Sequence, residues 1–171
     1  LFPYTTLFRS SRLRKEAIYV RIGGKTIADL VVMPVETLAD FFASLELDAH
    51  DTKTAARILT EIRNRLQYLM DVGLGYLTLD RLSSTLSGGE SQRVKLASFL
   101  SKESTEGNVM FIFDEPTTGL HFHDINKLLD AFNALIVRGH TIVIVEHNMD
   151  VIKCADWVVD LGPEAGDRGG S

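Results

Sequence analysis

The sequence contains very little cysteine and no long apolar run. Its single cysteine, Cys154, cannot form an internal disulfide, and one thiol alone cannot make a zinc site. No apolar stretch approaches the length of a membrane span, and no basic-then-apolar leader precedes a small-residue cleavage site. These absences predict a cytoplasmic protein with no disulfide, no zinc ligands in this chain and no membrane partner.

Positive charge is also in short supply. The chain carries 18 lysines and arginines against 23 acidic residues, a net charge of −5. This balance argues against a protein that coats nucleic acid along its whole surface, although it leaves room for a local basic patch. At 171 residues the chain is long enough for one domain with a real core.

A phosphate-cradling loop of the form G-x-x-x-x-G-K-[ST] is missing. Gly24-Lys25-Thr26 supplies the end of that pattern, but Tyr19 stands where its first glycine is needed. We therefore interpret Gly23 and Gly24, which follow an apolar run, as the turn of a β-hairpin.

Residues 86–93 (Leu-Ser-Gly-Gly-Glu-Ser-Gln-Arg) predict the start of a helix. Ser87 can cap it and Glu90, three residues on, can close a capping box. Gly88 and Gly89 leave the first backbone N–H groups uncovered, so a phosphate can approach them and the helix dipole. Taken alone, the motif is equally compatible with an ordinary capped surface helix; a buried face is indicated by Val94, Leu96, Ala97 and Leu100.

Two carboxylates follow an apolar run at residues 109–113, which we predict to be a central strand covered on both faces. Ligands bind at the carboxyl ends of parallel strands, so Asp114 is placed to hold Mg²⁺ and Glu115 to orient and deprotonate a water molecule. Adjacent acids are often only solvated loop residues, but the preceding strand and the following Pro116 favour a functional pair.

A second apolar run, residues 141–145, ends in Glu146-His147, and His147 could donate a hydrogen bond to a terminal phosphate. A capping histidine is the alternative. Residues 117–121 form a tight connection and residues 125–137 have the spacing of a crossover helix between parallel strands. We further expect a short helix at residues 151–154 and a third strand at residues 157–161.

The order and spacing of these segments are typical of ABC-type ATPases. Residues 86–93, 111–121, 145–150 and 160–170 together closely resemble the UvrA family, the damage-recognising ATPases of bacterial nucleotide excision repair. The resemblance runs from about residue 13 to the end. It implies ATP and Mg²⁺ as cofactors, with Glu115 and His147 as catalytic residues and Asp114 as the metal ligand. The nucleotide-binding residues that it implies are Ser87, Gly88, Gly89, Glu90, Gln92, Asp114 and Gly119.

The same resemblance implies the partners: damaged duplex DNA, a UvrB-like repair protein, and a second ATPase half or a homodimer. In the family, zinc is held upstream of the part that this chain matches. Residues 13–91 look more like the first ATPase half and residues 94 onward like the second, so the junction is either natural or chimeric. An ABC transporter subunit and a pseudo-ATPase that only binds nucleotide or DNA are the competing interpretations. Without a phosphate loop, the isolated chain is expected to be inactive.

We therefore predict an α/β fold, part of the parallel sheet of a P-loop NTPase of the ABC class, preceded by a helical signature-domain segment. Residues 1–10 match nothing in the family and are taken as a non-native leader. Residues 11–85 form the helical segment, with amphipathic helices at 35–45 and 54–72, and residues 86–171 form the C-terminal part of the ATPase domain. Arg57, Arg63 and Arg65 are candidate DNA contacts, a solvated helix face being the alternative.

Overall fold

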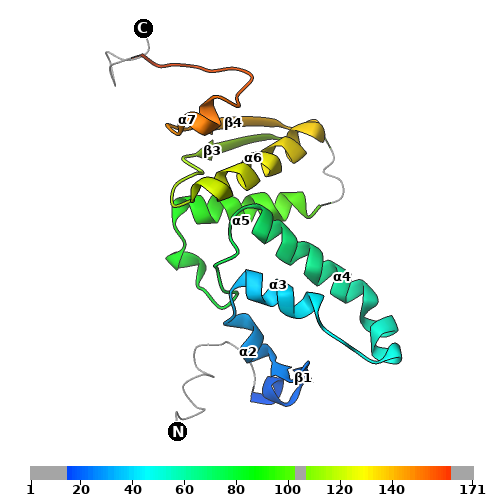
Figure 1. Cartoon of the computed structure of the whole chain (residues 1–171). Helices are drawn as coiled ribbons and strands as arrows, with labels where there is room; N and C mark the ends of the chain where they lie inside the picture. The colour runs from blue at the N-terminus through cyan, green and yellow to red at the C-terminus, as the bar shows by residue number, and fades with distance from the viewer. Residues whose placement is uncertain (1–14, 103–106, 163–171) are drawn as a thin grey trace.

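A computed structural model describes residues 15–102 and 107–162 of the chain. A pair of parallel strands lies at one end, a small β-hairpin lies at the other, and helices are stacked between them (Figure 1). The expected leader at residues 1–10 and most of the glycine-rich ending at residues 160–170 fall outside the described residues. None of the described helices is long and apolar enough to cross a bilayer.

The hairpin confirms the turn expected from the paired glycines. A 3₁₀ helix, η1 (Lys15–Tyr19), leads into β1 (Arg21–Ile22), which pairs antiparallel with β2 (Lys25–Thr26). Gly23 and Gly24 have φ values of 52° and 78°, the left-handed conformation that a two-residue type I′ turn requires. Thr26 then caps the short helix α2 (Ile27–Val31) in a capping box with Asp29.

Two amphipathic helices form the middle of the stack. They are α3 (Val35–Ala43) and α4 (Ala49–Asp71), and α4 begins five residues earlier than its apolar spacing predicts. The side chain of Asp48 accepts the N–H of Asp51 and so caps α4, which extends the helix through a polar first turn. A first core cluster holds α2, α3 and α4 together; its buried members are Leu30, Val35, Leu38, Phe42 and Leu66.

The strand pair and its helices form the other half. A 3₁₀ turn, η2 (Ser83–Thr85), leads to α5 (Gly88–Leu100), and β3 (Met110–Asp114), α6 (Phe122–Val137), β4 (Thr141–Val145) and α7 (Met149–Ile152) follow. β3 and β4 pair in parallel, with Met110 opposite Thr141 and Asp114 opposite Val145. The α/β expectation is thus confirmed. A second core cluster, including Leu74, Leu96, Phe113, Leu128 and Leu135, fills the space between the strands, α5 and α6.

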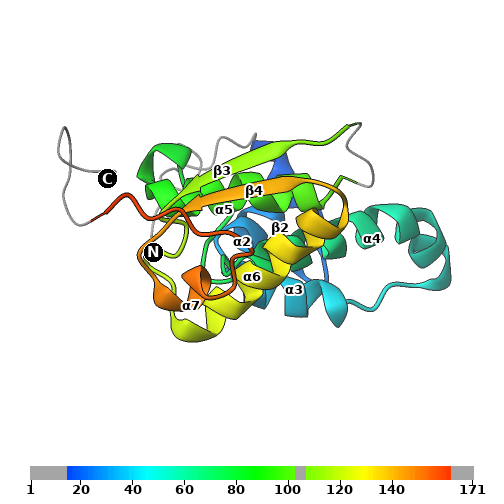
Figure 2. The ribbon, with the colours of Figure 1, turned by 90° about the horizontal axis from the view of Figure 1, so that it is seen from above.

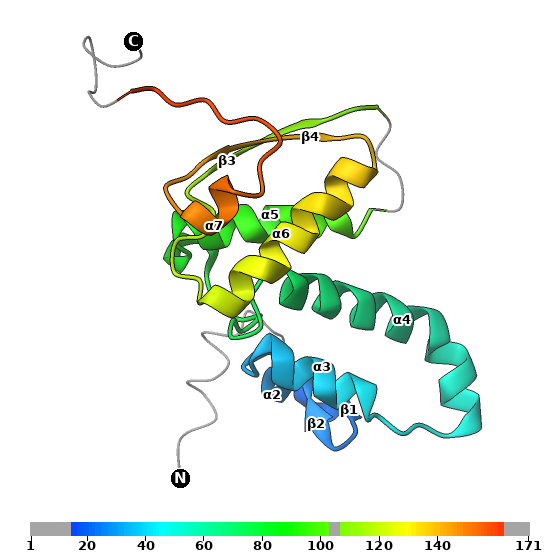
Figure 3. The same cartoon turned by 45° about the horizontal axis from the view of Figure 1, so that its top comes forward.

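The expectation that residues 109–113 are covered on both faces is wrong for the described chain. Phe111 and Phe113 are 8% and 5% exposed, whereas Met110 and Ile112 on the opposite face are 63% and 69% exposed. The reason is visible in Figures 2 and 3: α5 and α6 both lie on one side of the strands.

Two smaller expectations after β4 also need correction. Residues 157–161 do not form a strand, and Trp157 is 92% exposed, because no neighbouring described strand offers that segment backbone partners. The short helix expected at residues 151–154 starts two residues earlier, because Asn148 caps it by accepting the N–H of Asp150.

Candidate functional site

The start of α5 has the geometry that its sequence predicts. The hydroxyl of Ser87 accepts the N–H of Glu90 at 3.2 Å, and the carboxylate of Glu90 accepts the N–H of Ser87 at 2.7 Å. The capping box is therefore confirmed. An alanine-like Cβ built on Gly88 would meet nothing within 4 Å, so the first turn of α5 stays open on that side. The arrangement leaves room for an anion near the first N–H groups of the helix.

Glu90 is more deeply buried than a nucleotide contact needs to be. It is 7% exposed. Its Oε1 accepts the hydroxyl of Tyr76 at 2.7 Å and lies 3.3 Å from Nη1 of Arg81. Burial alone would raise the pKa of Glu90, but the hydrogen bonds from Tyr76 and Ser87 and the charge of Arg81 outweigh it and lower that pKa. Glu90 thus fixes the start of α5, and any contact with a nucleotide stays a prediction.

The next two side chains of the motif connect α5 to the end of β3. The amide of Gln92 donates to the carbonyl of Asp114 at 3.0 Å, and its oxygen accepts the N–H of Asp114 at 3.2 Å. Arg93 is 1% exposed and donates from Nη1 to the carbonyls of Pro116 and Thr118 at 2.8 and 3.3 Å. The helix start and the carboxylate pair therefore form one rigid unit.

The two acids and the histidine come together at the carboxyl ends of the strands. Asp114 is the last residue of β3, and Glu115 follows it in a left-handed conformation with φ 45°. Nδ1 of His147 lies 3.8 Å from Oε1 of Glu115, and both side chains are exposed, at 77% and 57%. The structure thus brings Glu115 and His147 side by side.

The described residues contain no group of three or more histidine, cysteine, aspartate or glutamate side chains that could hold a metal. Magnesium commonly uses one or two carboxylates and completes its shell with water and substrate phosphates. The exposed Asp114, with Glu115 beside it, fits a magnesium ion bound in that way.

Several residues at this site carry contacts that motif spacing does not reveal. Tyr76 and Arg81 lie in the loop before the motif, and nothing in the local pattern points to Glu90 as their partner. Arg93 is the last residue of the motif at residues 86–93, and Glu146 directly precedes His147. Both are charged residues at positions that helix and strand periodicity assign to the interior, and this was the available signal.

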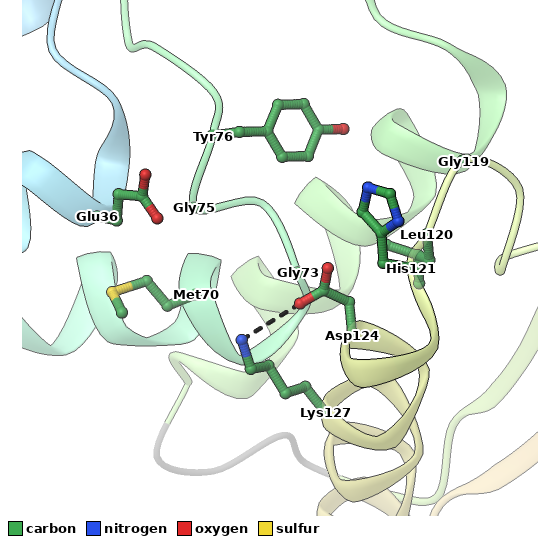
Figure 4. A pocket seen from close by; sticks show the side chains of 10 residues that line it. All are labelled: Glu36, Met70, Gly73, Gly75, Tyr76, Gly119, Leu120, His121, Asp124 and Lys127. Atoms are coloured by element: carbon green, nitrogen blue, oxygen red, sulfur yellow. Dashed lines mark hydrogen bonds and ion pairs between the residues drawn. The ribbon is translucent and has the colours of Figure 1, made fainter.

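A cavity of about 510 Å³ lies between the loop that carries Tyr76 and the segment at residues 119–121, and Asp114 and Glu115 do not line it. As Figure 4 shows, Tyr76 and His121 lie along its border, and Lys127, which also lines it, pairs with Asp124 at 3.2 Å. The remaining lining comes from both halves of the chain: Glu36, Met70, Gly73, Gly75, Gly119 and Leu120.

The arginines of α4 are partly committed to other groups. Arg63 donates from Nε and Nη2 to the carbonyl of Phe42 at 3.0 and 2.8 Å and so holds the end of α3. Arg65 pairs with Glu61 at 2.7 Å on the exposed surface. Contact of Arg57, Arg63 and Arg65 with DNA stays a prediction, and the bond to Phe42 makes it less favourable for Arg63.

Comparison with known proteins gives a consistent result. The chain is 48% identical over 163 residues to "UvrABC system protein A" of Clostridium perfringens, which covers 95% of this chain and 16% of that protein. It is 48% identical over 162 residues to the protein of the same name from Thermus thermophilus, covering 95% of this chain and 15% of the other. No protein-family model matches the chain.

A solved structure agrees with the sequence matches. The crystal structure of UvrA2 from Deinococcus radiodurans superposes with a TM-score of 0.80 at 39% identity, covering 92% of this chain and 21% of that one. The chain thus spans about 16% of the length of the curated relative from Clostridium perfringens. Because the likeness runs through nearly the whole chain in both sequence and fold, the chain belongs to the UvrA family and corresponds to a segment of such a protein.

Proposed function

We propose that this chain is part of a UvrA-type ATPase of nucleotide excision repair. In that protein it would supply the signature motif, the metal-binding carboxylate, the general base and the switch histidine of an ATP site. The observation that carries the proposal is the convergence of the α5 start, Asp114, Glu115 and His147 at one edge of the β3–β4 pair. Bound ATP with Mg²⁺ would supply the phosphoryl group and the metal charge.

Each side chain has one task in this proposal. Asp114 binds the metal, directly or through water. Glu115 accepts a proton from the attacking water, and its exposed carboxylate at the strand end is accessible for that role. His147 donates from its ring to the terminal phosphate. The start of α5, which has open space beside Gly88 although Gly89 is buried, would receive phosphate oxygens from nucleotide that we assign to a second ATPase half.

In the complete protein, hydrolysis would be coupled to inspection of damaged DNA and to loading of a UvrB-like partner. The names of the matching proteins support this assignment over an ABC transporter subunit. A pseudo-ATPase is less favoured because Glu115 and His147 are both present and lie 3.8 Å apart.

The test replaces Glu115 by glutamine in the complete protein. We expect ATP binding to persist and steady-state hydrolysis to fall by about 10²-fold or more, the typical contribution of a general base. Glu46→Gln, the same chemical change at an exposed site between α3 and α4, serves as the matched control. Hydrolysis at the wild-type rate in Glu115→Gln would remove that residue from the mechanism.

A further inference from the structure

Glu146 makes an unusual set of contacts for a residue next to a switch histidine. Its side chain is 2% exposed. Oε1 accepts both the N–H of Thr117, at 3.0 Å, and the hydroxyl of Thr117. Oε2 accepts the N–H groups of His147 and Asn148, at 2.9 and 3.0 Å. One oxygen therefore serves the turn after Glu115, and the other serves the loop after β4.

A carboxylate suits this arrangement. Three of the four partners of Glu146 are backbone N–H groups, which can only donate, and the carboxylate accepts them on both of its oxygens. A glutamine of the same shape has one acceptor oxygen, so its NH₂ group would face donors of Thr117 or donors of His147 and Asn148. Facing donors leave at least one buried N–H without a partner, which is costly.

The turn that Glu146 holds is also bonded to α5. Arg93, reaching from the signature helix, donates to the carbonyls of Pro116 and Thr118, which flank Thr117. Pro116 and Thr117 are themselves buried. The turn is thus bonded to α5 through Arg93 and to the His147 loop through Glu146.

We propose that Glu146 is the positioning residue that fixes His147 relative to Glu115 and ties that placement to the Thr117 turn. The inference rests on the proposed ATPase function and deepens it, because Glu146 acts only through other groups. A shift of α5 that moves the turn would be passed through Thr117 and Glu146 to the backbone of His147. The signature helix and the switch histidine are then mechanically connected within one chain.

The first experiment examines the hydrogen bonds by which Glu146 joins the Thr117 turn to the His147 loop, and it needs no ATPase activity. Backbone amide exchange of the 171-residue chain is followed by NMR in the wild type and in Glu146→Gln. We expect exchange at Thr117, His147 and Asn148 to accelerate at least tenfold together. The N–H of Glu115, which donates to the carbonyl of Val145 at 2.9 Å, is the internal reference and should change less than threefold. Faster exchange in only one of the two loops, or equally faster exchange at Glu115, would refute the proposal that Glu146 joins the two loops.

The second experiment measures steady-state kinetics of the complete protein. For Glu146→Gln we expect kcat for ATP hydrolysis to fall at least tenfold while KM for ATP changes less than threefold. A positioning defect affects the reacting geometry more than nucleotide affinity. Glu46→Gln should match the wild type. A fall in activity that merely follows a lowered melting temperature, and that disappears on cooling, would show a structural role only.

Thr117 gives a second pair of variants should Glu146→Gln fail to fold. Thr117→Ser keeps both donors, whereas Thr117→Val keeps the shape and removes the hydroxyl donor. We expect kcat within threefold of the wild type for the serine and at least a threefold fall for the valine. Equal rates in the two variants would refute the inference. A wild-type complete protein without hydrolysis would instead refute the proposed function, whatever the amide exchange shows.

Discussion

At the scale of single residues, Glu115 combines a proposed chemical role with a strained backbone. Its φ of 45° lies in the left-handed region. The conformation is imposed from both sides, since the Glu115 N–H donates to Val145 and the Glu115 carbonyl accepts from Thr118 at 3.1 Å. Such strain is often stored at functional sites, where the surrounding structure holds it in place.

This strain predicts that glycine is better tolerated than alanine at position 115. Both substitutions remove the carboxylate, but only glycine removes the Cβ that opposes a positive φ. We expect Glu115→Gly to be more stable than Glu115→Ala by about 1 kcal/mol. Urea unfolding of the 171-residue chain measures the difference. Equal stabilities would mean that the backbone of the free chain relaxes away from the left-handed conformation.

The two glycines of the signature motif should also respond differently. A Cβ on Gly89 would lie 3.2 Å from Nη1 of the buried Arg93 and 3.4 Å from the carbonyl of Thr118, whereas a Cβ on Gly88 has open space. We expect Gly89→Ala to destabilise the chain by about 1 kcal/mol or more through overpacking, and Gly88→Ala to leave it within about 0.5 kcal/mol. Chemical denaturation of both variants in parallel tests the contrast, and equal costs would contradict it.

At the scale of elements, the parts that the sequence predicted correctly are those with local causes. The capping box of Ser87 and Glu90 and the Gly23-Gly24 turn depend on neighbours only a few positions apart. The missed features depend on distant partners. Arg93 donates to the distant carbonyls of Pro116 and Thr118, and one oxygen of Glu146 accepts from the distant Thr117, and no periodicity records such pairings.

The start of α4 illustrates the same limit within one element. Apolar spacing indicates where a helix faces a core, so the prediction began at residue 54, shortly before the first apolar residues of the pattern. The helix in fact continues backward through a polar turn to the Asp48 cap. The strand predicted at residues 157–161 is absent for a different reason. Residues that favour β structure form a strand only where a neighbouring strand is available to pair with them.

The β1–β2 hairpin allows a prediction about turn geometry. Gly24 has φ 78° with nothing within 4 Å of a built Cβ, whereas a Cβ on Gly23 would lie 3.0 Å from Leu45 and 3.1 Å from Phe41. We expect Gly24→Ala to cost about 1 kcal/mol from backbone strain alone. Gly23→Ala should cost more, since crowding adds to the strain. Thermal unfolding of the two variants ranks their stabilities. A reversed order would show that side chains near Gly23 move aside at little cost in free energy.

At the scale of the whole molecule, buried carboxylates connect stability to pH. Burial acts to raise the pKa values of Glu90 and Glu146, but hydrogen bonds outweigh it: from Tyr76 and Ser87 for Glu90, and from Thr117, Asn148 and His147 for Glu146. Both pKa values therefore fall below the ordinary 4.5. As the pH falls, the unfolded chain binds these protons first, so the folded state loses stability.

The resulting prediction is a loss of stability on the acid side only. The contribution of the two carboxylates is fully present above their ordinary pKa of 4.5 and is lost as the pH falls through their lower folded-state values. Urea midpoints between about pH 6 and about pH 3 should therefore decline, and Glu146→Gln should decline less steeply than the wild type. Parallel curves for the two proteins would exclude Glu146 as a source of the acid sensitivity.

The arrangement of the whole molecule also decides what the 171-residue chain can do alone. Binding the β and γ phosphates of ATP needs backbone amides and a lysine from a phosphate loop. Lys25 and Thr26 resemble the end of such a loop, but they form β2 of the hairpin, at the opposite end of the stack from β3 (Figure 1). Asp114, Glu115 and His147 therefore have no phosphate cradle beside them among the described residues.

We expect this polypeptide to show no ATPase activity and at most weak nucleotide affinity, although Asp114, Glu115, His147 and the start of α5 have the geometry described above. Supplying the rest of a UvrA-type ATPase in one protein should restore hydrolysis. Release of phosphate by the purified chain is the measurement, with Glu115→Gln as the control for contaminating ATPases. Turnover in the wild-type chain that disappears in Glu115→Gln would contradict the expectation, because it would require a phosphate cradle within these 171 residues.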